Sequence, residues 1–321
     1  MAQRHSPSDY QTMKNRAHEG PRRPGLPGRL PAWLACILLL VAGVAWSGGL
    51  EASGAAGLRA RHVELAAALA HNQFHAPLYL ESKETPQQSE GDLYAVVDFP
   101  FSTVNSALND STHWCDVLIL HLNTKYCRAK TIGAAAQLDL RIGKKYDQPV
   151  ADASELLFTY RSVTATPQYF DIELNAPSGP FGTSHYTIVL EAVPIEGDHT
   201  LLHLGYAFGY GTVSHMALQV YLATLGSGKV GFTILGVPRA GDPPRYIGGM
   251  RGLVERNTMR YYLAIEAYLG SLATPQAGRA QWRFEHWFDA TEQYPRQLHE
   301  IDRAPYLEMK RNEYQRQQAA P

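Results

Sequence analysis

The sequence predicts an α+β fold in which an antiparallel sheet packs against one long helix near the C-terminus. Residues 137–210 contain several segments that alternate apolar and polar side chains and are separated by turn residues. Residues 249–272 place their apolar side chains within one sector of about 120° when projected as a helix. An uncharged apolar run, Leu30 to Leu50, precedes both patterns.

This apolar run decides the expected location of the protein. Its 21 residues are enough to cross roughly 30 Å of hydrocarbon as a helix. Basic residues outnumber acidic ones in residues 1–29, which predicts a cytoplasmic N-terminus and an extracytoplasmic C-terminal part, periplasmic in a bacterium. The alternative is a cleavable signal peptide at residues 30–50, because small residues follow at 52–56, and the protein would then be secreted to the periplasm.

Composition limits what lies beyond the membrane. Without its first 50 residues the chain keeps about 270, the size of one large domain or of a domain with an extension. The net charge of −1 gives no reason to expect a nucleic-acid partner. Cys115 and Cys127 could form a disulfide in an oxidising compartment. Two unpaired thiols are the alternative, since a sequence does not show whether two Cβ atoms meet.

The first elements after the membrane are short. Residues 51–90 are expected to hold a membrane-proximal helix at 57–73 and a polar linker that begins at Glu81 and runs to Gly91. A strand is predicted at 92–98 and a short helix at 102–108. Asn109, Asp110 and Ser111 offer a cap for a second short helix that carries Trp114.

The sheet is predicted from strands at 137–142, 155–163, 168–174, 185–193 and 200–210, a helix at 213–225 and a last strand at 229–235. One face of the 200–210 strand is bulky, and the other carries His203, Gly205, Ala207 and Gly209. A nearly bare face leaves room for a packed helix or a ligand. We therefore expect His203 to point into the space under the long helix.

The long helix at 249–272 has one polar residue, Asn257, in its apolar sector, with Arg251, Glu255 and Glu266 on the opposite side. A buried amide needs hydrogen-bond partners or costs roughly 1–3 kcal/mol. Asn257 either ties the helix to strand backbone or contacts the polar end of a ligand. Residues 276–321 combine aromatic and charged side chains, which predicts a helical extension docked on the domain; a protein-binding surface is the alternative.

The segment from Tyr94 through Asp98 to Val104, continuing to His113 and Trp114, is similar to the opening of the START-like helix-grip superfamily. In that family a strand ends, a helix begins at a turn with proline, and a tryptophan follows a short second helix. The resemblance covers about residues 91–272 and defines an expected START-like domain at 91–275. It implies a curved antiparallel sheet that grips the long helix and binds a hydrophobic molecule, often a lipid. The helix at 213–225 and the tail after Pro275 depart from the family pattern.

The first functional hypothesis is a membrane-tethered extracytoplasmic domain that binds a lipid or another hydrophobic small molecule between sheet and helix. Arg161 could bind an anionic head group, or it could pair with Asp139 or Glu173 across the sheet. The candidate cavity residues are Trp114, His121, Arg161, His203, Tyr206, Asn257 and Tyr261.

Two other hypotheses stay open. An enzyme of the same fold could use His203, Asn257 or Tyr206 for acid–base chemistry on a cyclic or aromatic substrate. A non-catalytic interaction module of an envelope assembly could bind a protein through the C-terminal extension. The sequence contains no recognisable nucleophile–base pair, so we assign no catalytic residue, lean against an enzyme, and expect no metal and no cofactor.

Overall fold

The computed structural model describes residues 54–319 except 134, 225 and 237–240. These residues belong to one compact unit, Gly48–Pro321. They form one sheet of eight strands in the order β1-β2-β8-β7-β6-β5-β4-β3, and every neighbouring pair is antiparallel. The strands are β1 (Leu78–Glu84), β2 (Gln88–Val97), β3 (Thr124–Ile132), β4 (Ala135–Ile142), β5 (Ser154–Thr166), β6 (Tyr169–Ser178), β7 (Thr183–Ile195) and β8 (His199–Tyr210).

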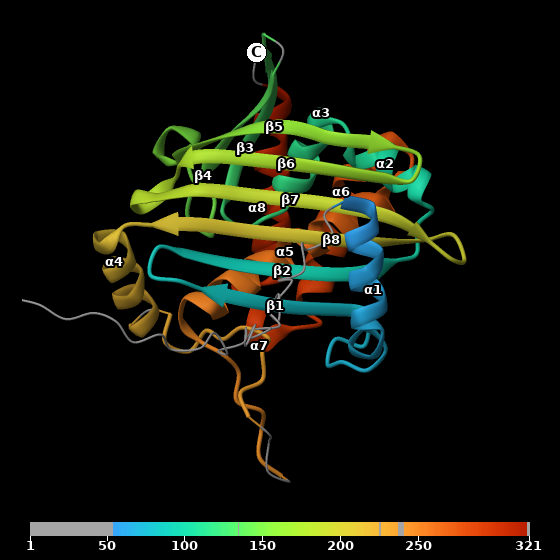
Figure 1. Ribbon diagram of the computed structural model, residues 1–321. Coiled ribbons are helices and arrows are strands. Elements are labelled where there is room, and N and C mark those ends of the chain that lie inside the picture. The colour runs from blue at the N-terminus through green and yellow to red at the C-terminus, as the bar shows by residue number, and fades with distance from the viewer. Residues whose placement is uncertain (1–53, 134, 225, 237–240, 320–321) are drawn as a thin grey trace, which may run out of the picture. The chain divides into compact units, whose positions relative to one another are not determined.

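The helices lie on both faces of this sheet. Figure 1 shows α1 on the near face, and α3, α5, α6 and α8 on the far face. Their bounds are α1 (Gly54–Ala70), α2 (Phe101–Leu108), α3 (Ser111–Leu118), α4 (Thr212–Ala223), α5 (Gly249–Gly270), α6 (Gln276–Thr291), α7 (Pro295–Leu298) and α8 (Arg303–Ala319). The near face is called the outer face below, and the face that carries α5 is called the inner face.

Most of the predicted elements are present. The strands expected between residues 137 and 210 correspond to β4–β8, and the helices expected at 102–108, 213–225 and 249–272 correspond to α2, α4 and α5. Asp110 caps α3, because its side chain accepts a hydrogen bond from the backbone N–H of Thr112. A curved antiparallel sheet with a long helix across its inner face is a helix-grip arrangement (Figure 1).

Three local predictions are wrong. The expected linker from Glu81 to Gly91 is the turn and flanking strands of the β1–β2 hairpin. Along β1, burial alternates from one residue to the next: Leu78, Leu80 and Ser82 are buried and their neighbours are not. The polar residues of the segment hide this alternation in the sequence. β3 was not predicted, because its second half is polar and exposed. The expected strand at 229–235 is irregular and contains one bridge, from Ile234 to Tyr246.

The sheet and α5 approach each other closely at one glycine. A Cβ atom at Gly91 of β2 would lie 2.5 Å from the Thr258 hydroxyl oxygen, so only glycine fits at this crossing. The apolar side of α5 packs on β1, β2 and β8 beside this point, with Val254 fully buried. This contact fixes the height of α5 above the sheet.

The C-terminal extension covers the other side of α5. Trp287 of α6 is buried and donates a hydrogen bond from Nε1 to the backbone oxygen of Arg260, at 3.0 Å. Tyr306 of α8 is fully buried and stacks on Trp287. Both helices therefore dock on the domain, and Trp287 and Tyr306 are not free to bind a partner protein.

This cover corrects the expected polar side of α5. Glu255 is fully buried, and its carboxylate accepts hydrogen bonds from the Ser82 hydroxyl at 2.6 Å and from the backbone N–H groups of Phe232 and Thr233 at 2.6 and 2.9 Å. Arg256 and Arg260 are buried as well. Helical periodicity gives the charged side of a helix, but it does not show that other segments of the chain will cover that side.

The expected transmembrane segment, Leu30–Leu50, lies outside the described residues. Among the helices that the structure does describe, none combines the length and apolar character needed to cross a bilayer.

Candidate functional site

The side chains of β8 alternate between two different environments. Leu202, Leu204 and Tyr206 point to the inner face and are buried under α5. His203 therefore lies on the outer face, away from α5, which corrects the expectation that it points under the long helix. The reason is that the bulky side of a strand has the larger area to remove from water, so that side faces the core.

On the outer face, both ring nitrogens of His203 have a carboxylate partner. Nδ1 lies 2.8 Å from Glu191 Oε2, and Nε2 lies 2.9 Å from Asp92 Oδ1. Burial alone would lower the pKa of His203, but these two carboxylates raise it to about 9. The ring also stacks on Tyr94, with 4.5 Å between centroids. A protonated histidine with all its donors used is a structural bridge between β2, β8 and β7.

Arg161 and Trp114 also lie away from the partly exposed side of α5. Arg161 is exposed on β5 and pairs with Glu173 of β6 at 2.6 Å, the cross-strand alternative that the sequence left open. Trp114 is buried, and its Nε1 donates to the backbone oxygen of Leu108 at 2.9 Å. Trp114 thus joins α3 to the end of α2.

The remaining four candidates meet on the inner face and are called the inner cluster: His121, Tyr206, Asn257 and Tyr261. The His121 and Tyr261 rings stack with 5.2 Å between centroids, and Tyr206 lies at the same centroid distance from Tyr261. The Asn257 side chain lies between His121 and Tyr206. Its interaction with each ring favours a higher pKa for His121 and a lower pKa for Tyr206, although burial outweighs both effects. Tyr186 of β7 borders the cluster beside Tyr206.

One stripe of α5 keeps accessible surface at this place. Leu253, Asn257 and Tyr261, each four residues apart and so on one side of the helix, are partly exposed. Val254 and Thr258, one residue further along, are fully buried. Burial nevertheless raises the pKa of the Tyr261 hydroxyl far above its ordinary value. Deep position combined with accessible surface is typical of residues that line a recess.

The loop that carries His121 is held from several sides. A disulfide joins Cys115 of α3 to Cys127 of β3, with 5.2 Å between Cα atoms, and closes the chain around residue 121. From α8, the Lys310 ammonium donates to the backbone oxygens of His121 at 2.7 Å and Thr124 at 3.0 Å. These contacts fix the ring position before any ligand binds.

His121 itself lacks one partner. Its Nδ1 accepts a hydrogen bond from the backbone N–H of Asn123, at 3.2 Å, so a neutral ring carries its proton on Nε2. Burial lowers the pKa of His121 well below its ordinary value, and the charges of Arg260 and Lys310 lower it further, so the ring is neutral. Among the described residues, Nε2 has no hydrogen-bond partner. The inner cluster therefore contains a buried donor that reaches no acceptor within full hydrogen-bond geometry, with the Asn257 side chain beside it.

A group of charges, called the cationic group, lies beside the inner cluster and consists of Lys145, Lys229, Arg260 and Glu300. Lys145 Nζ lies 2.7 Å from Glu300 Oε2, Lys229 contacts the same oxygen, and Arg260 Nη2 lies 3.2 Å from Glu300 Oε1. Burial would raise the pKa of Glu300, but the cations lower it to about 2. Burial also lowers the pKa of Lys145, to about 8.

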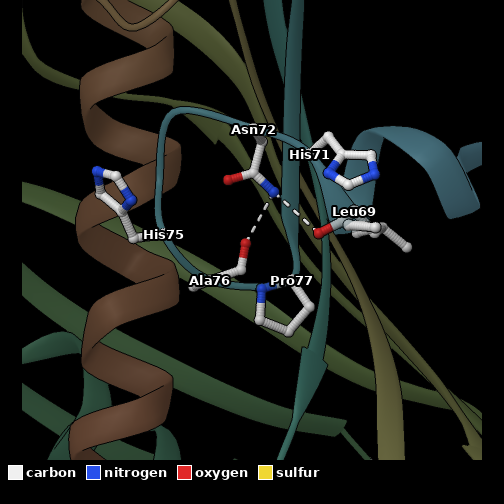
Figure 2. Close-up of a pocket in the computed structure, with 7 residues that line it drawn as sticks. Leu69, His71, Asn72, His75, Ala76 and Pro77 are labelled. Atoms are coloured by element: carbon white, nitrogen blue, oxygen red, sulfur yellow. Dashed lines mark hydrogen bonds between the residues drawn. The ribbon is translucent and has the colours of Figure 1, made fainter.

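Two surface pockets lie elsewhere, and neither is lined by α5. The first, of about 830 Å³, follows the end of α1 (Figure 2). There the Asn72 side chain donates to the backbone oxygens of Leu69 and Ala76, at 2.9 and 2.8 Å, and so closes the loop. His71 and His75 lie on opposite sides of this loop in Figure 2 and do not converge on a common point.

The second pocket, of about 620 Å³, lies beside α2 at the ends of β5 and β7. Asn105 of α2 donates to the backbone oxygen of Thr166 there. Ser106 and His199 are among the lining residues of this pocket; the Ser106 hydroxyl donates to the backbone oxygen of Thr103, and His199 Nδ1 lies 2.9 Å from Asp98 Oδ1. No group of three metal-binding side chains occurs in the part of the chain that the structure describes.

The sequence did not identify Lys145, Lys229 or Glu300 as site residues. Each lies in an irregular segment, and their partners are between 40 and 155 residues away along the chain, so no local pattern joins them. A signal did exist in Arg260, which directly precedes Tyr261 of the partly exposed stripe of α5. An arginine at the edge of a buried helix face requires an anion, and the sequence does not show which one.

No protein-family model and no curated protein matches this chain. Several solved structures are similar at low identity. TTHA0849 from Thermus thermophilus is 11% identical over 58% of this chain and 99% of its own, with a TM-score of 0.38. A truncated norcoclaurine synthase from Thalictrum flavum is 9% identical over 45% of this chain and 91% of its own, with a TM-score of 0.30. Ara h 8.0201 is 9% identical over 60% and 99%, with a TM-score of 0.33. At these TM-scores no conclusion about function follows.

Proposed function

We propose that this protein is a membrane-tethered extracytoplasmic domain that binds a lipid or another hydrophobic small molecule at the inner cluster. One observation carries the proposal: the Leu253–Asn257–Tyr261 stripe keeps accessible surface, whereas the adjacent Val254 and Thr258 are fully buried. The unused Nε2 donor of His121 lies beside this stripe. An unsatisfied buried donor costs about 1–3 kcal/mol, which a ligand acceptor would recover.

The chemistry of the cluster favours an apolar or aromatic ligand body. Tyr186, Tyr206 and Phe208 form a continuous set of rings, with centroids 5.7 to 6.5 Å apart. Burial raises the pKa of Tyr206 well above its ordinary value, so its hydroxyl is neutral. Ligand sites are commonly apolar walls with a few placed polar groups, which is the composition found here.

The membrane part of the proposal rests on Leu30–Leu50 and on the basic residues before it. The Cys115–Cys127 disulfide supports an oxidising compartment. Protease added to sealed right-side-out membranes should digest a C-terminal tag and leave an N-terminal tag intact. Release of the whole domain without detergent would instead favour the cleaved signal peptide.

Binding is tested by native mass spectrometry of the full chain taken from membranes. We expect an added mass in the range of a lipid or metabolite, together with a thermal midpoint that rises with that molecule. Asn257→Leu should remove the added mass, whereas Asn175→Leu on the exposed outer face of β6 should keep it. A ligand-free chain whose thermal midpoint ignores every molecule in a broad lipid panel would contradict the proposal.

The two other functions lose specific support. His203 lies on the opposite face of the sheet from Asn257 and Tyr206, so these three groups do not meet for acid–base chemistry. The aromatic side chains of the extension that an interaction module would expose are largely buried, including Phe284, Trp287 and Phe288.

A further inference from the structure

The cationic group holds more positive than negative charge. Lys145 and Lys229 both contact the same carboxylate oxygen of Glu300, so these two lysines share a single negative charge. Glu300 is about 95% buried, so water cannot fully screen this group. Two cations that share one anion in such a place favour the approach of a second anion.

The two lysines have unused donors. Each ammonium group has three N–H donors, and Glu300 is the acceptor that Lys145 and Lys229 share among the described residues. Their side chains are 31% and 27% exposed, so the remaining donors can reach a molecule that arrives from solvent. Lys145 is therefore both partly accessible and held in place by Glu300.

The cationic group is continuous with the inner cluster. Arg260 directly precedes Tyr261 on α5, and the charges of Arg260 and Lys145 are close enough to lower the pKa of His121. His121 adds its unused Nε2 donor from the α3–β3 loop. Hence Lys145 and Lys229 meet at Glu300, Arg260 joins Glu300 to α5 beside Tyr261, and Tyr261 stacks on His121.

We propose that the ligand of the inner cluster ends in an oxyanion, a carboxylate or a phosphate, which Lys145, Lys229 and the Nε2 donor of His121 bind. This inference rests on the proposed function and adds the chemical class of the ligand. Charge-assisted hydrogen bonds of this kind are about twice as strong as neutral ones. The apolar body of the ligand lies along Leu253, Asn257 and Tyr261.

An alternative role for the cationic group is to fasten the C-terminal extension through Glu300. The two roles predict opposite effects for one variant. If the group only fastens the tail, Glu300→Gln weakens everything that depends on the fold. If the group binds an anion, Glu300→Gln removes the resident competitor and raises affinity for an anionic ligand, as long as the chain stays folded.

The experiment compares matched probes on the full chain in amphipol by isothermal titration calorimetry. Decanoate, decyl phosphate and uncharged 1-decanol share one apolar body and differ in the head group. The variants are Lys145→Met, Lys229→Met and Glu300→Gln. The control is Lys144→Met, which removes the same charge from the next position of the same loop, where the side chain is exposed and pairs with Tyr146 rather than Glu300. Circular dichroism confirms folding of each variant.

We expect at least one anionic probe to bind about 10-fold more tightly than 1-decanol. Lys145→Met and Lys229→Met should each remove most of this preference, Lys144→Met should keep it, and Glu300→Gln should increase it. Equal affinity for all three probes would overturn the oxyanion and leave the proposed function standing. The oxyanion would also be overturned if Lys144→Met lost the preference for the anionic probes over 1-decanol as completely as Lys145→Met and Lys229→Met. No binding of any probe would instead count against the proposed function itself.

Discussion

The two faces of the sheet use similar residues in different ways. On the outer face, His203 has a carboxylate on each ring nitrogen, and Arg161 has Glu173. On the inner face, within the described part of the chain, His121 has a hydrogen bond of full geometry on Nδ1 alone, and Lys145 and Lys229 share one carboxylate oxygen. Groups whose partners are complete hold the fold together. Groups whose partners are incomplete have capacity left for a ligand, and this difference is what places the candidate site on the inner face.

The largest expected effect concerns charges that are both buried and paired. Glu313 of α8 lies between Lys125 and Lys310 at 2.8 and 2.7 Å, and all three side chains are fully buried. Glu313→Gln would leave two buried ammonium groups without a carboxylate and should lower the free energy of unfolding by about 3–5 kcal/mol. Chemical denaturation measures this.

A matched control lies at the same end of α8. Asp147→Asn removes the partner of Arg316, and both of these side chains are about two-fifths exposed or somewhat less. This change should cost less than about 1 kcal/mol. Equal losses for Glu313→Gln and Asp147→Asn would show that α8 is not held by its buried charges.

An intermediate effect is expected at His203, and it depends on pH. The pKa of His203 is raised in the folded state from 6.5 to about 9, so its stabilising contribution is complete below pH 6.5 and disappears as pH rises to about 9. His203→Gln should therefore cost roughly 1.5–3 kcal/mol at pH 6 and much less at pH 10. Urea titrations of both proteins across this range measure the difference. If the difference in unfolding free energy between the two proteins grew as the pH rose, His203 would not be a protonated bridge between Glu191 and Asp92.

The smallest effect on stability is expected at His121. His121→Phe keeps the stacking on Tyr261, loses the weak bond from the Asn123 N–H and removes the unsatisfied Nε2 donor. These changes nearly cancel, so stability should change by less than about 1 kcal/mol. Ligand affinity should nevertheless fall, as measured by the shift in thermal midpoint on adding decanoate. A large loss of stability would mean that His121 is a structural residue like His203.

The sequence predicted the fold better than the site, for physical reasons. Alternation along β4–β8 and the 3.6-residue period of α5 are local patterns, so each segment reveals its own secondary structure. The position of His203 was predicted on the wrong side because the bare face of β8 was expected to meet α5, whereas the bulky face has the larger apolar area to bury. The polar face of α5 was predicted to lie opposite the sheet, but Glu255 is buried by contacts with Ser82 of β1 and with residues 232 and 233, which lie far from it along the chain.

Tyr206, Asn257 and Tyr261 were all predicted as cavity residues, but their meeting was not, because it requires the bulky face of β8 to pack against α5. His121 followed from its place after the second short helix. Lys145, Lys229 and Glu300 lie in loops, and only the folded chain shows that they surround a single carboxylate. Ion pairs between distant loops produce no regular spacing of residues that a sequence could reveal.

The central claim is that the inner face binds a ligand and the outer face does not. Photolabelling tests it most directly, with a decanoate that carries a diazirine near the middle of its chain, added to the full protein and mapped by peptide mass spectrometry. The account predicts labels on β8 and α5 around Tyr206, Asn257 and Tyr261, removed by excess decanoate. Labels confined to the outer face around His203 and Arg161, or spread over exposed side chains without competition, would contradict it.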